Sequence, residues 1–332
     1  MRKIALCTGQ WADLSLKELA KKTKEMGYDG VELATWISNL DFEKLAGSKA
    51  YADEIKDIFN KEKLDIVSLS CHIIGKCVGD IIDIRHNNFV PKKYADKPLE
   101  IKKWAIDSML KIPSSAKNLG VDVVPGFMGS SIWKFVYSYP QTTEEMIEAG
   151  FEEIKTLWSP ILLEFQKLNI KYALEVHPSE IAFDYYSTVR LLEKLKDFPL
   201  FGINFDPSHL YWQGVKPELF LEDFLKQNKI FHIHFKDSNI NLDGRSGILS
   251  SHIDFGDLRR GWNFVSVGHG GVDFEKIIRL LNAYDYTGPS SIEWEDSGME
   301  REFGAKDALR YIRKINFAPS TFKFDEAISS SN

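Results

Sequence analysis

The sequence predicts a single α/β domain folded as an eight-stranded (β/α)₈ barrel, with long connections after its third and seventh strands. Two observations lead to this prediction. Short apolar runs alternate eight times with longer amphipathic segments along the 332 residues, and several runs are almost continuously apolar, as in strands buried on both faces of a parallel sheet. An open doubly wound sheet is the alternative, but no glycine-rich phosphate loop follows any of the runs.

The eight units can be placed along the chain from the period of their apolar residues. Runs rich in Val, Ile, Leu and Phe predict strands at 3–8, 29–35, 64–70, 121–127, 170–176, 200–206, 229–235 and 289–295. Apolar residues at helical spacing predict helices at 15–26, 41–62, 99–118, 144–168, 186–196, 217–227, 273–283 and 303–314.

The remaining segments are two long connections and a tail. The connections at 71–98 and 236–272 are long for a compact barrel, and we expect them to form lids over the carboxyl ends of the strands. We expect the barrel to occupy residues 1–315, followed by a C-terminal tail at 316–332.

Composition excludes several classes of protein. The net charge of −6 argues against a nucleic-acid partner, which needs clustered Lys and Arg. No stretch reaches the roughly 18 apolar residues of a membrane helix, and the N-terminal apolar run ends at Gly9, too early for a signal peptide. Three cysteines without a CxxC pair, Cys7, Cys71 and Cys77, are expected to be buried and unpaired. These features together predict a cytoplasmic protein.

Four ligand-type side chains fall at the carboxyl ends of the fifth to eighth strands: Glu175, Asp206, His234 and Glu293. Barrel strands direct such side chains toward a common mouth, so we expect the four to converge. Three carboxylates and one imidazole suit Mn²⁺, Mg²⁺ or Co²⁺. Taken singly, Asp206 could instead be a helix N-cap and His234 a core histidine, but their occurrence on four successive strands favours a metal site.

Residues two apart on a strand share a face, which adds candidates around these ligands. His177 shares the face of Glu175, so it is a candidate catalytic base beside the metal; a hydrogen-bonding role behind the ligands is the alternative. By the same rule, Glu295 is an alternative to Glu293 as the fourth ligand.

Further polar residues near the predicted mouth are candidates for substrate binding, with loop packing as the alternative. His209 follows Asp206 by three residues, and Glu32 lies on the second strand. The residues that we expect to contact substrate are His209, Lys236 and His72.

Motifs along almost the whole chain resemble the xylose-isomerase-like barrel family of sugar phosphate isomerases and epimerases. They include ELATW, SCHIIG, DIRH, LEVHPSEIAFD, NFDPSHLYWQG, HIHFKD and SIEWEDSGM. The family's metal ligands correspond to Glu175, Asp206, His234 and Glu293, and its substrate-contacting histidine corresponds to His209. The resemblance implies proton removal beside a sugar carbonyl that is polarised by the metal.

Within the family, LEVHP and the long seventh loop resemble the large (alpha) subunit of bacterial C-glycoside deglycosidases. This resemblance implies Mn²⁺, a small β-sandwich partner in a hetero-oligomer, and a 3-oxo-C-glucoside substrate. His177 would take the C2 proton, and β-elimination would break the carbon–carbon bond to an aromatic aglycone. The alternative is a sugar (phosphate) isomerase or epimerase acting on a keto sugar, although Ile240 replaces an arginine of some keto-sugar 3-epimerases.

Two other classes of function remain for comparison. A nuclease resembling endonuclease IV would need more His and Asp ligands and a basic face, and the sequence displays neither. A non-catalytic binding barrel would tolerate replacement of all four candidate ligands.

Overall fold

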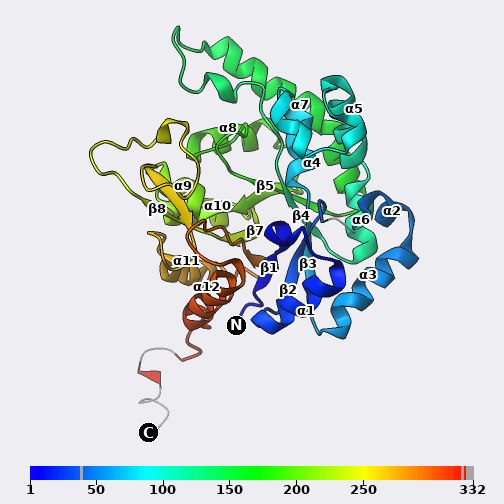
Figure 1. The fold of residues 1–332 in the computed structure, drawn as a ribbon, viewed down its shortest axis with the longest axis vertical. Helices are drawn as coiled ribbons and strands as arrows, with labels where there is room; N and C mark the ends of the chain where they lie inside the picture. Colours follow the sequence, from blue (N-terminus) through cyan, green and yellow to red (C-terminus); the bar gives the residue numbers. More distant parts are fainter. Residues whose placement is uncertain (38–39, 323–324, 327–332) are drawn as a thin grey trace.

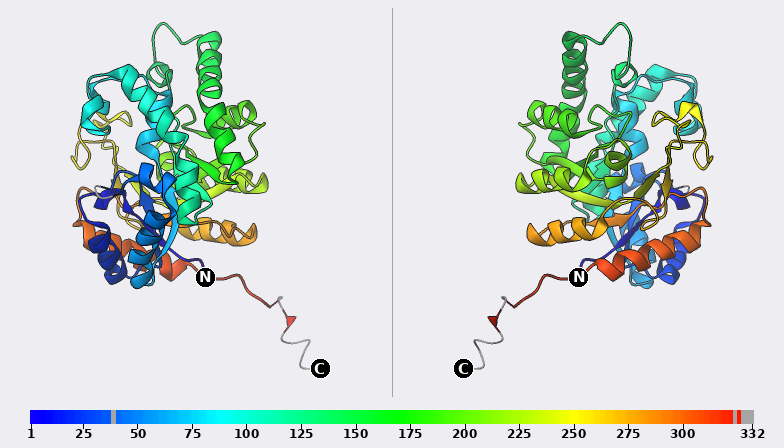
Figure 2. Two further views of the ribbon diagram at one scale, coloured as in Figure 1. Left: turned by 90° about the vertical axis from the view of Figure 1, so that its right-hand side faces the viewer. Right: turned by 90° about the vertical axis from the view of Figure 1, so that its left-hand side faces the viewer.

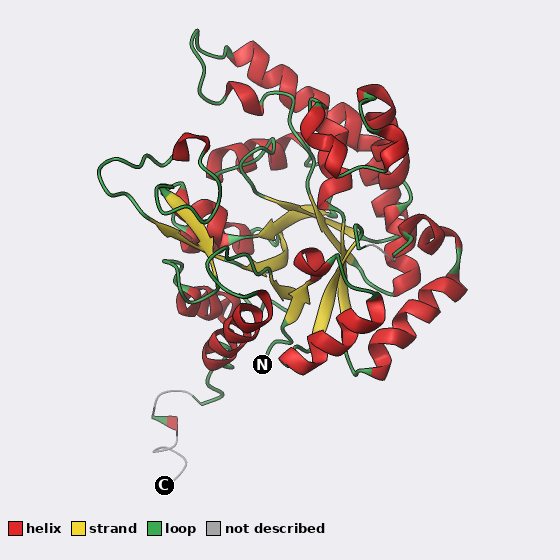
Figure 3. Cartoon of the chain, viewed as in Figure 1, coloured by secondary structure: helices red, strands yellow, loops and turns green. Residues whose placement is uncertain are grey.

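The structure is a computed structural model that describes residues 1–37, 40–322 and 325–326. Within these residues, eight parallel strands form a nearly closed barrel surrounded by helices (Figures 1 and 3), which confirms the predicted single-domain fold class. The barrel strands are β1 (Ala5–Cys7), β2 (Gly30–Ala34), β3 (Asp65–Ser70), β4 (Val123–Gly126), β5 (Lys171–Glu175), β6 (Phe201–Phe205), β7 (Ile230–Phe235) and β10 (Ser290–Ile292).

Hydrogen bonds join the barrel strands in the order β3-β2-β1-β10-β7-β6-β5-β4. The two ends of this order, β3 and β4, are connected where the amide of Cys71 donates to the carbonyl of Pro125 at 2.9 Å. Because all the strands are parallel, their carboxyl ends lie at one mouth, where β5, β6, β7 and β10 are successive neighbours.

Helices cover the outside of the barrel because each presents one apolar face to the sheet. In the first of them, Ser15 and Glu18 form a capping box, and Gly27 ends the helix at φ 97°, a conformation that glycine adopts without strain. The helices are α1 (Leu16–Met26), α2 (Phe42–Gly47), α3 (Lys49–Lys61), α4 (His72–Gly79), α5 (Pro98–Met109), α6 (Ile112–Leu119), α7 (Glu144–Lys167), α8 (Tyr185–Lys194), α9 (Pro207–Trp212), α10 (Pro217–Lys226), α11 (Phe274–Ala283) and α12 (Arg301–Ile315).

Two helices that the sequence predicts as continuous are each divided in the structure. The predicted helix 41–62 consists of α2 and α3, since Ser48 adopts an extended conformation and its hydroxyl accepts the amide of Tyr51 to begin α3. The predicted helix 99–118 consists of α5 and α6. Pro113 lies in the first turn of α6, the part of a helix where a missing amide hydrogen costs no hydrogen bond.

Both long connections contain regular structure that the apolar period does not predict. The first begins with α4, directly after β3. The second contains an antiparallel hairpin of β8 (Asp237–Ile240) and β9 (Trp262–Val265), which lies outside the barrel sheet (Figure 1). The hairpin, α4 and α9 all follow barrel strands, so they lie on the side of the mouth.

Several sequence predictions about the rest of the chain can be compared with the structure. All three cysteines are buried and unpaired, as predicted. Among the described residues, no helix has the length and apolarity needed to cross a membrane; the cytoplasmic location stays a prediction. The chain leaves the barrel after α12 (Figure 2), and residues 323–324 and 327–332 of the expected tail lie outside the described residues.

Candidate metal centre

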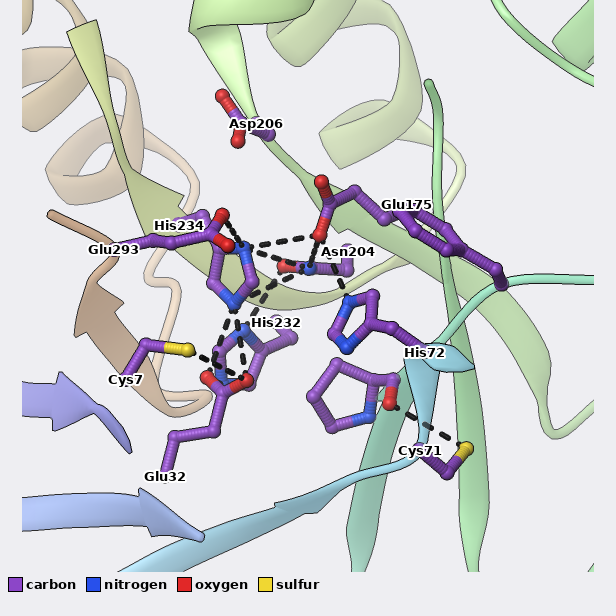
Figure 4. A network of polar contacts seen from close by, with 12 residues as sticks. Cys7, Glu32, Cys71, His72, Glu175, Asn204, Asp206, His232, His234 and Glu293 are labelled. Carbon is purple, nitrogen blue, oxygen red and sulfur yellow. Dashed lines mark hydrogen bonds and ion pairs between the residues drawn. The ribbon is translucent and has the colours of Figure 1, made fainter. Parts of the chain in front are cut away.

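Four side chains from the carboxyl ends of β5, β6, β7 and β10 meet at one point of the mouth (Figure 4). Glu175, Asp206, His234 and Glu293 each offer one ligand atom, and these atoms all lie within 4.8 Å of one another. His234 Nδ1 is 3.1 Å from both Glu175 Oε2 and Glu293 Oε2. The four residues that the sequence singles out are therefore neighbours in space.

The donor set fits a divalent cation. Asp206 Oδ2 and Glu293 Oε2 accept no hydrogen bond, although Asp206 is buried. Opposite ligands of a Mg²⁺-sized ion lie about 4.2 Å apart, twice the usual Mg–O distance, so the cluster needs little contraction to bind one. Burial alone would raise the pKa of each of the three carboxylates, but the charges of His234, His209 and Lys236 lower it, so all three are ionised and can act as ligands. The cluster could thus hold a metal ion.

Asp206 caps a helix with one carboxylate oxygen and directs the other toward the cluster. Its Oδ1 accepts the amide of Ser208 at 2.8 Å and the hydroxyl of Ser208 at 2.7 Å, and so caps α9. Its Oδ2 is left toward the cluster and lies 3.3 Å from His209 Nε2. Capping therefore orients this carboxylate and does not compete with metal binding.

The two glutamates that follow β10 have different partners, which distinguishes their roles. Glu295 accepts a hydrogen bond from Gln10 Nε2 at 2.9 Å and pairs with Lys236 Nζ at 3.0 Å. Glu293 Oε2 lies 3.2 Å from the same ammonium and 3.1 Å from His234 Nδ1. Glu293 therefore belongs to the cluster, while Glu295 lies on the other side of Lys236.

Glu32, at the centre of β2, lies against the side of His234 that faces away from the cluster. Its Oε2 is 3.0 Å from His234 Nε2 and 3.2 Å from His232 Nε2. Burial alone would raise the pKa of Glu32, but the charges of His234 and His232 hold it well below its usual range. The His234 Nε2–H donates to this carboxylate, so a cation that replaced the Nδ1 proton would meet the lone pair of Nδ1 on the side of the cluster.

Two further side chains orient Glu175. Its Oε2 accepts from His72 Nε2 at 2.9 Å and from Asn204 Nδ2 at 3.1 Å. His72 is buried, with the edge of Phe127 at 4.8 Å between ring centroids. His72 is thus a partner of a candidate ligand, and its contact with substrate stays a prediction. Nothing in the sequence distinguishes Asn204 from any other polar strand residue.

His177 and His209 form a pair of imidazoles beside Glu175, with ring centroids 4.0 Å apart. Burial alone would lower the pKa of His209, but Asp206 and Glu175 raise it to about 9. Burial and the charge of His209 hold the pKa of His177 well below its usual range. His177 Nδ1 donates to the carbonyl of Pro178, which leaves Nε2 as the acceptor nitrogen. A neutral acceptor thus lies beside a cationic donor.

Lys236 lies buried between the cluster and the β8–β9 hairpin. Burial alone would lower the pKa of Lys236, but Glu293 and Glu295 raise it well above its usual range, so the side chain is an ammonium. Phe264 of β9 packs on this ammonium, with 4.4 Å from Nζ to the ring centroid, and its ring is 5.4 Å from that of His209. The hairpin therefore forms one wall of the site.

A buried ion pair that sequence reasoning missed supports the turn after His177. Lys76 Nζ of α4 is 2.8 Å from Glu180 Oε1. Glu180 Oε2 accepts the amide of Met128 at 2.8 Å and the amide of Gly129 at 2.5 Å. This ion pair and its two hydrogen bonds join the segments that follow β3, β4 and β5. Lysine and glutamate are usually exposed, so no sequence signal indicated it.

Comparisons of the sequence with known proteins agree with this architecture. Residues 20–315 match the family model described as Xylose isomerase-like TIM barrel. The uncharacterized protein YfiH of Bacillus subtilis (strain 168) is 23% identical over 331 residues, covering 94% of this chain and 98% of YfiH. An inosose dehydratase of Clostridium beijerinckii is 30% identical over 125 residues, covering 37% of this chain and 41% of that protein.

Solved structures resemble the whole barrel at low identity. The apo form of 3-keto-D-glucoside 4-epimerase, YcjR, from E. coli has a TM-score of 0.66 at 15% identity, covering 95% of this chain and 100% of that chain. A xylose isomerase-like TIM barrel protein from Mycobacterium smegmatis in complex with magnesium has a TM-score of 0.62 at 16% identity, covering 95% of this chain and 97% of that chain. These likenesses concern the fold. Since the family model matches most of its residues, the chain belongs to the xylose isomerase-like TIM barrel family.

Proposed function

We propose that the protein is a divalent-metal-dependent enzyme that removes a proton from the carbon beside the carbonyl group of a keto sugar. One observation carries the proposal: a cluster suited to a cation lies next to His177, a neutral imidazole whose Nε2 accepts a proton. Epimerisation beside a keto group and loss of water beside a keto group both begin with removal of this proton. The names of YcjR and of the inosose dehydratase describe reactions of these two kinds.

Each residue around the cluster has a definite task in this reaction. A divalent ion held by the cluster would stabilise the enolate charge that develops on the carbonyl oxygen. His177 takes the proton at Nε2, and the hydrogen bond from its Nδ1 to Pro178 keeps the ring in place. The imidazolium of His209 supplies a proton to the product. The ammonium of Lys236 offsets part of the negative charge of Glu293 and Glu295.

The path of the second proton distinguishes two candidate functions. Return of a proton to the sugar makes the enzyme an isomerase or epimerase of keto sugars, the broader candidate. The second candidate is a carbon–carbon lyase acting on 3-oxo-C-glucosides, with Mn²⁺ and a small partner subunit. The proximity of His177 and His209 favours it, since one ring can take the C2 proton while the other protonates the departing aryl carbon.

The experiment combines elemental analysis with proton exchange. We expect one divalent ion per chain, and we expect the metal-loaded protein to exchange the α-proton of 3-keto-glucose in D₂O, followed by ¹H NMR. His177→Gln should abolish exchange with metal content unchanged. His269→Gln, a replacement of an exposed histidine paired with Asp307, is the control and should behave as wild type. No exchange with any keto sugar would refute the proposal, and near-normal exchange by His177→Gln would exclude it as the base.

A second assay separates the two candidates. The protein is mixed with 3-oxo-C-glucosides, with and without a co-expressed small partner. Release of the aglycone favours the lyase, whereas exchange of the C2 proton without release favours the isomerase or epimerase.

A further inference from the structure

A cavity of about 380 Å³, lined in part by Glu295, lies next to the candidate metal centre. Its volume is within the range of roughly 300–1,000 Å³ of small-molecule sites. Its walls come from segments that follow β1, β7 and β10, which are adjacent in the barrel, so it opens at the same mouth. The lining residues that matter here are Gln10, Phe255, Phe264, Trp294, Glu295 and Asp296.

One side chain connects this cavity with the metal centre. Lys236 Nζ is 3.2 Å from Glu293 of the cluster and 3.0 Å from Glu295, which lines the cavity. The same ammonium lies 4.4 Å from the ring centroid of Phe264, another lining residue. A substrate whose reacting carbonyl lies at the cluster could therefore extend past Lys236 into the cavity.

The lining combines aromatic faces with hydrogen-bonding groups. Phe255 and Phe264 are stacked at 5.2 Å with an interplanar angle of 19°, and Phe255 is 50% exposed. The amide of Gln10 and the carboxylates of Glu295 and Asp296 supply the polar groups. No described Lys, Arg or His residue lines the cavity, although the guanidinium of Arg260 lies 3.8 Å from the ring centroid of Phe255. Aromatic faces with a few placed polar groups are typical of sites for small polar ligands with apolar surfaces.

We infer that this cavity binds a second, uncharged pyranose ring attached to the keto sugar, so that the substrate is a keto glycoside. The inference rests on the function proposed above. A pyranose presents C–H groups to Phe255 and hydroxyls to Gln10 and Glu295. A phosphate would lie near the carboxylates of Glu295 and Asp296, and the ammonium of Lys236 is already shared by Glu293 and Glu295. A flat aryl group would remove water from the polar groups without replacing their hydrogen bonds.

The test compares proton exchange on three probes: 3-keto-glucose, 3-keto-cellobiose and phenyl 3-keto-glucoside. For the wild type we expect kcat/KM on the disaccharide to exceed that on the monosaccharide by about tenfold or more. Phe255→Ala should lower this ratio roughly tenfold, and Gln10→Ala should lower it as well. The control Leu258→Ala alters a side chain that is 92% exposed nearby and does not line the cavity, and it should keep the ratio.

The outcomes separate this inference from the proposed function. If the wild type exchanges the proton of no probe, the proposed function fails. If it exchanges them but Phe255→Ala and Gln10→Ala leave the disaccharide ratio unchanged, the function stands and the pyranose subsite is wrong. A loss confined to the phenyl glucoside would also overturn the inference and would favour an aromatic substituent.

Discussion

Replacing Lys76 with methionine tests the buried ion pair behind the turn that carries His177. Methionine has a similar length, so the variant removes the charge and leaves the apolar packing of the side chain largely intact. Glu180 is fully buried and would keep two backbone amides as its only hydrogen-bond donors. Its charge would then have no counter-charge at hydrogen-bonding distance.

The structure sets the magnitude of this effect. Removal of one partner of a buried ion pair costs about 3–5 kcal/mol. The Lys76 side chain is 26% exposed, so water already screens part of the pair, and the two amides still stabilise Glu180. We therefore expect the free energy of unfolding to fall by about 3 kcal/mol, near the lower end of that range. Lys102→Met is the matched control, since Lys102 pairs with a partially exposed Glu153 at 3.5 Å and should lose less than about 1 kcal/mol.

Urea unfolding followed by circular dichroism at pH 7 measures both variants. Combining Lys76→Met with Glu180→Gln removes the unpaired charge, so the double variant should be more stable than Lys76→Met alone. Two results would refute this reasoning: a cost for Lys76→Met no larger than that of the control, or a double variant that loses the sum of both single effects.

Three further predictions concern the metal, the pH dependence and the hairpin. Mn²⁺ at a hundredfold excess over its Kd should stabilise the metal-free protein by about 2.7 kcal/mol in thermal unfolding, and Glu293→Gln should reduce this gain. Equal gains for the wild type and the variant would contradict metal binding by the cluster. The hydrogen bond and charge of Asp80 raise the pKa of His86, so its contribution to stability is complete below about pH 6.5 and is lost as pH rises through the raised pKa. The stability difference between wild type and His86→Gln should therefore shrink from pH 6 to pH 9; a constant difference would count against the pairing. Trp212 stacks on Trp262 at 4.3 Å and 4°, so Trp212→Ala should loosen the hairpin by roughly 1 kcal/mol and make its proteolysis about fivefold faster, while unchanged proteolysis would show that the stack does not hold the hairpin.

The strands and the first ligand candidates could be predicted from the sequence because both depend on local patterns. Buried parallel strands are apolar runs, and ligand-type residues recur where each run ends, as Glu175 and Asp206 do. The positions at which the predicted helices are divided were harder to predict from the sequence. The signal at Ser48 is one capping residue within a continuous apolar period, and the period dominated the prediction of one helix.

The contacts around the cluster could not be predicted because they join residues that are distant in the sequence. Glu32 and His234 are in contact although more than half of the sequence separates them, and no local pattern predicts that pair. The choice between Glu293 and Glu295 depends on where Lys236 lies between them. Both residues share a strand face, so alternation alone leaves them equivalent.

The polar interior of this barrel is best explained as a support for His234. Barrel interiors are usually filled by Val, Ile and Leu, yet here Ser68 Oγ lies 3.2 Å from His232 Nε2, and Asn204 Oδ1 lies 2.9 Å from His232 Nδ1. Buried polar groups cost stability unless they bond one another, and these do. Their network holds His232 beside Glu32, and Glu32 in turn accepts the Nε2–H of His234. Apolar residues here would pack as well but would leave the His234 ring free to turn, so its Nδ1 would no longer be held on the side of the cluster.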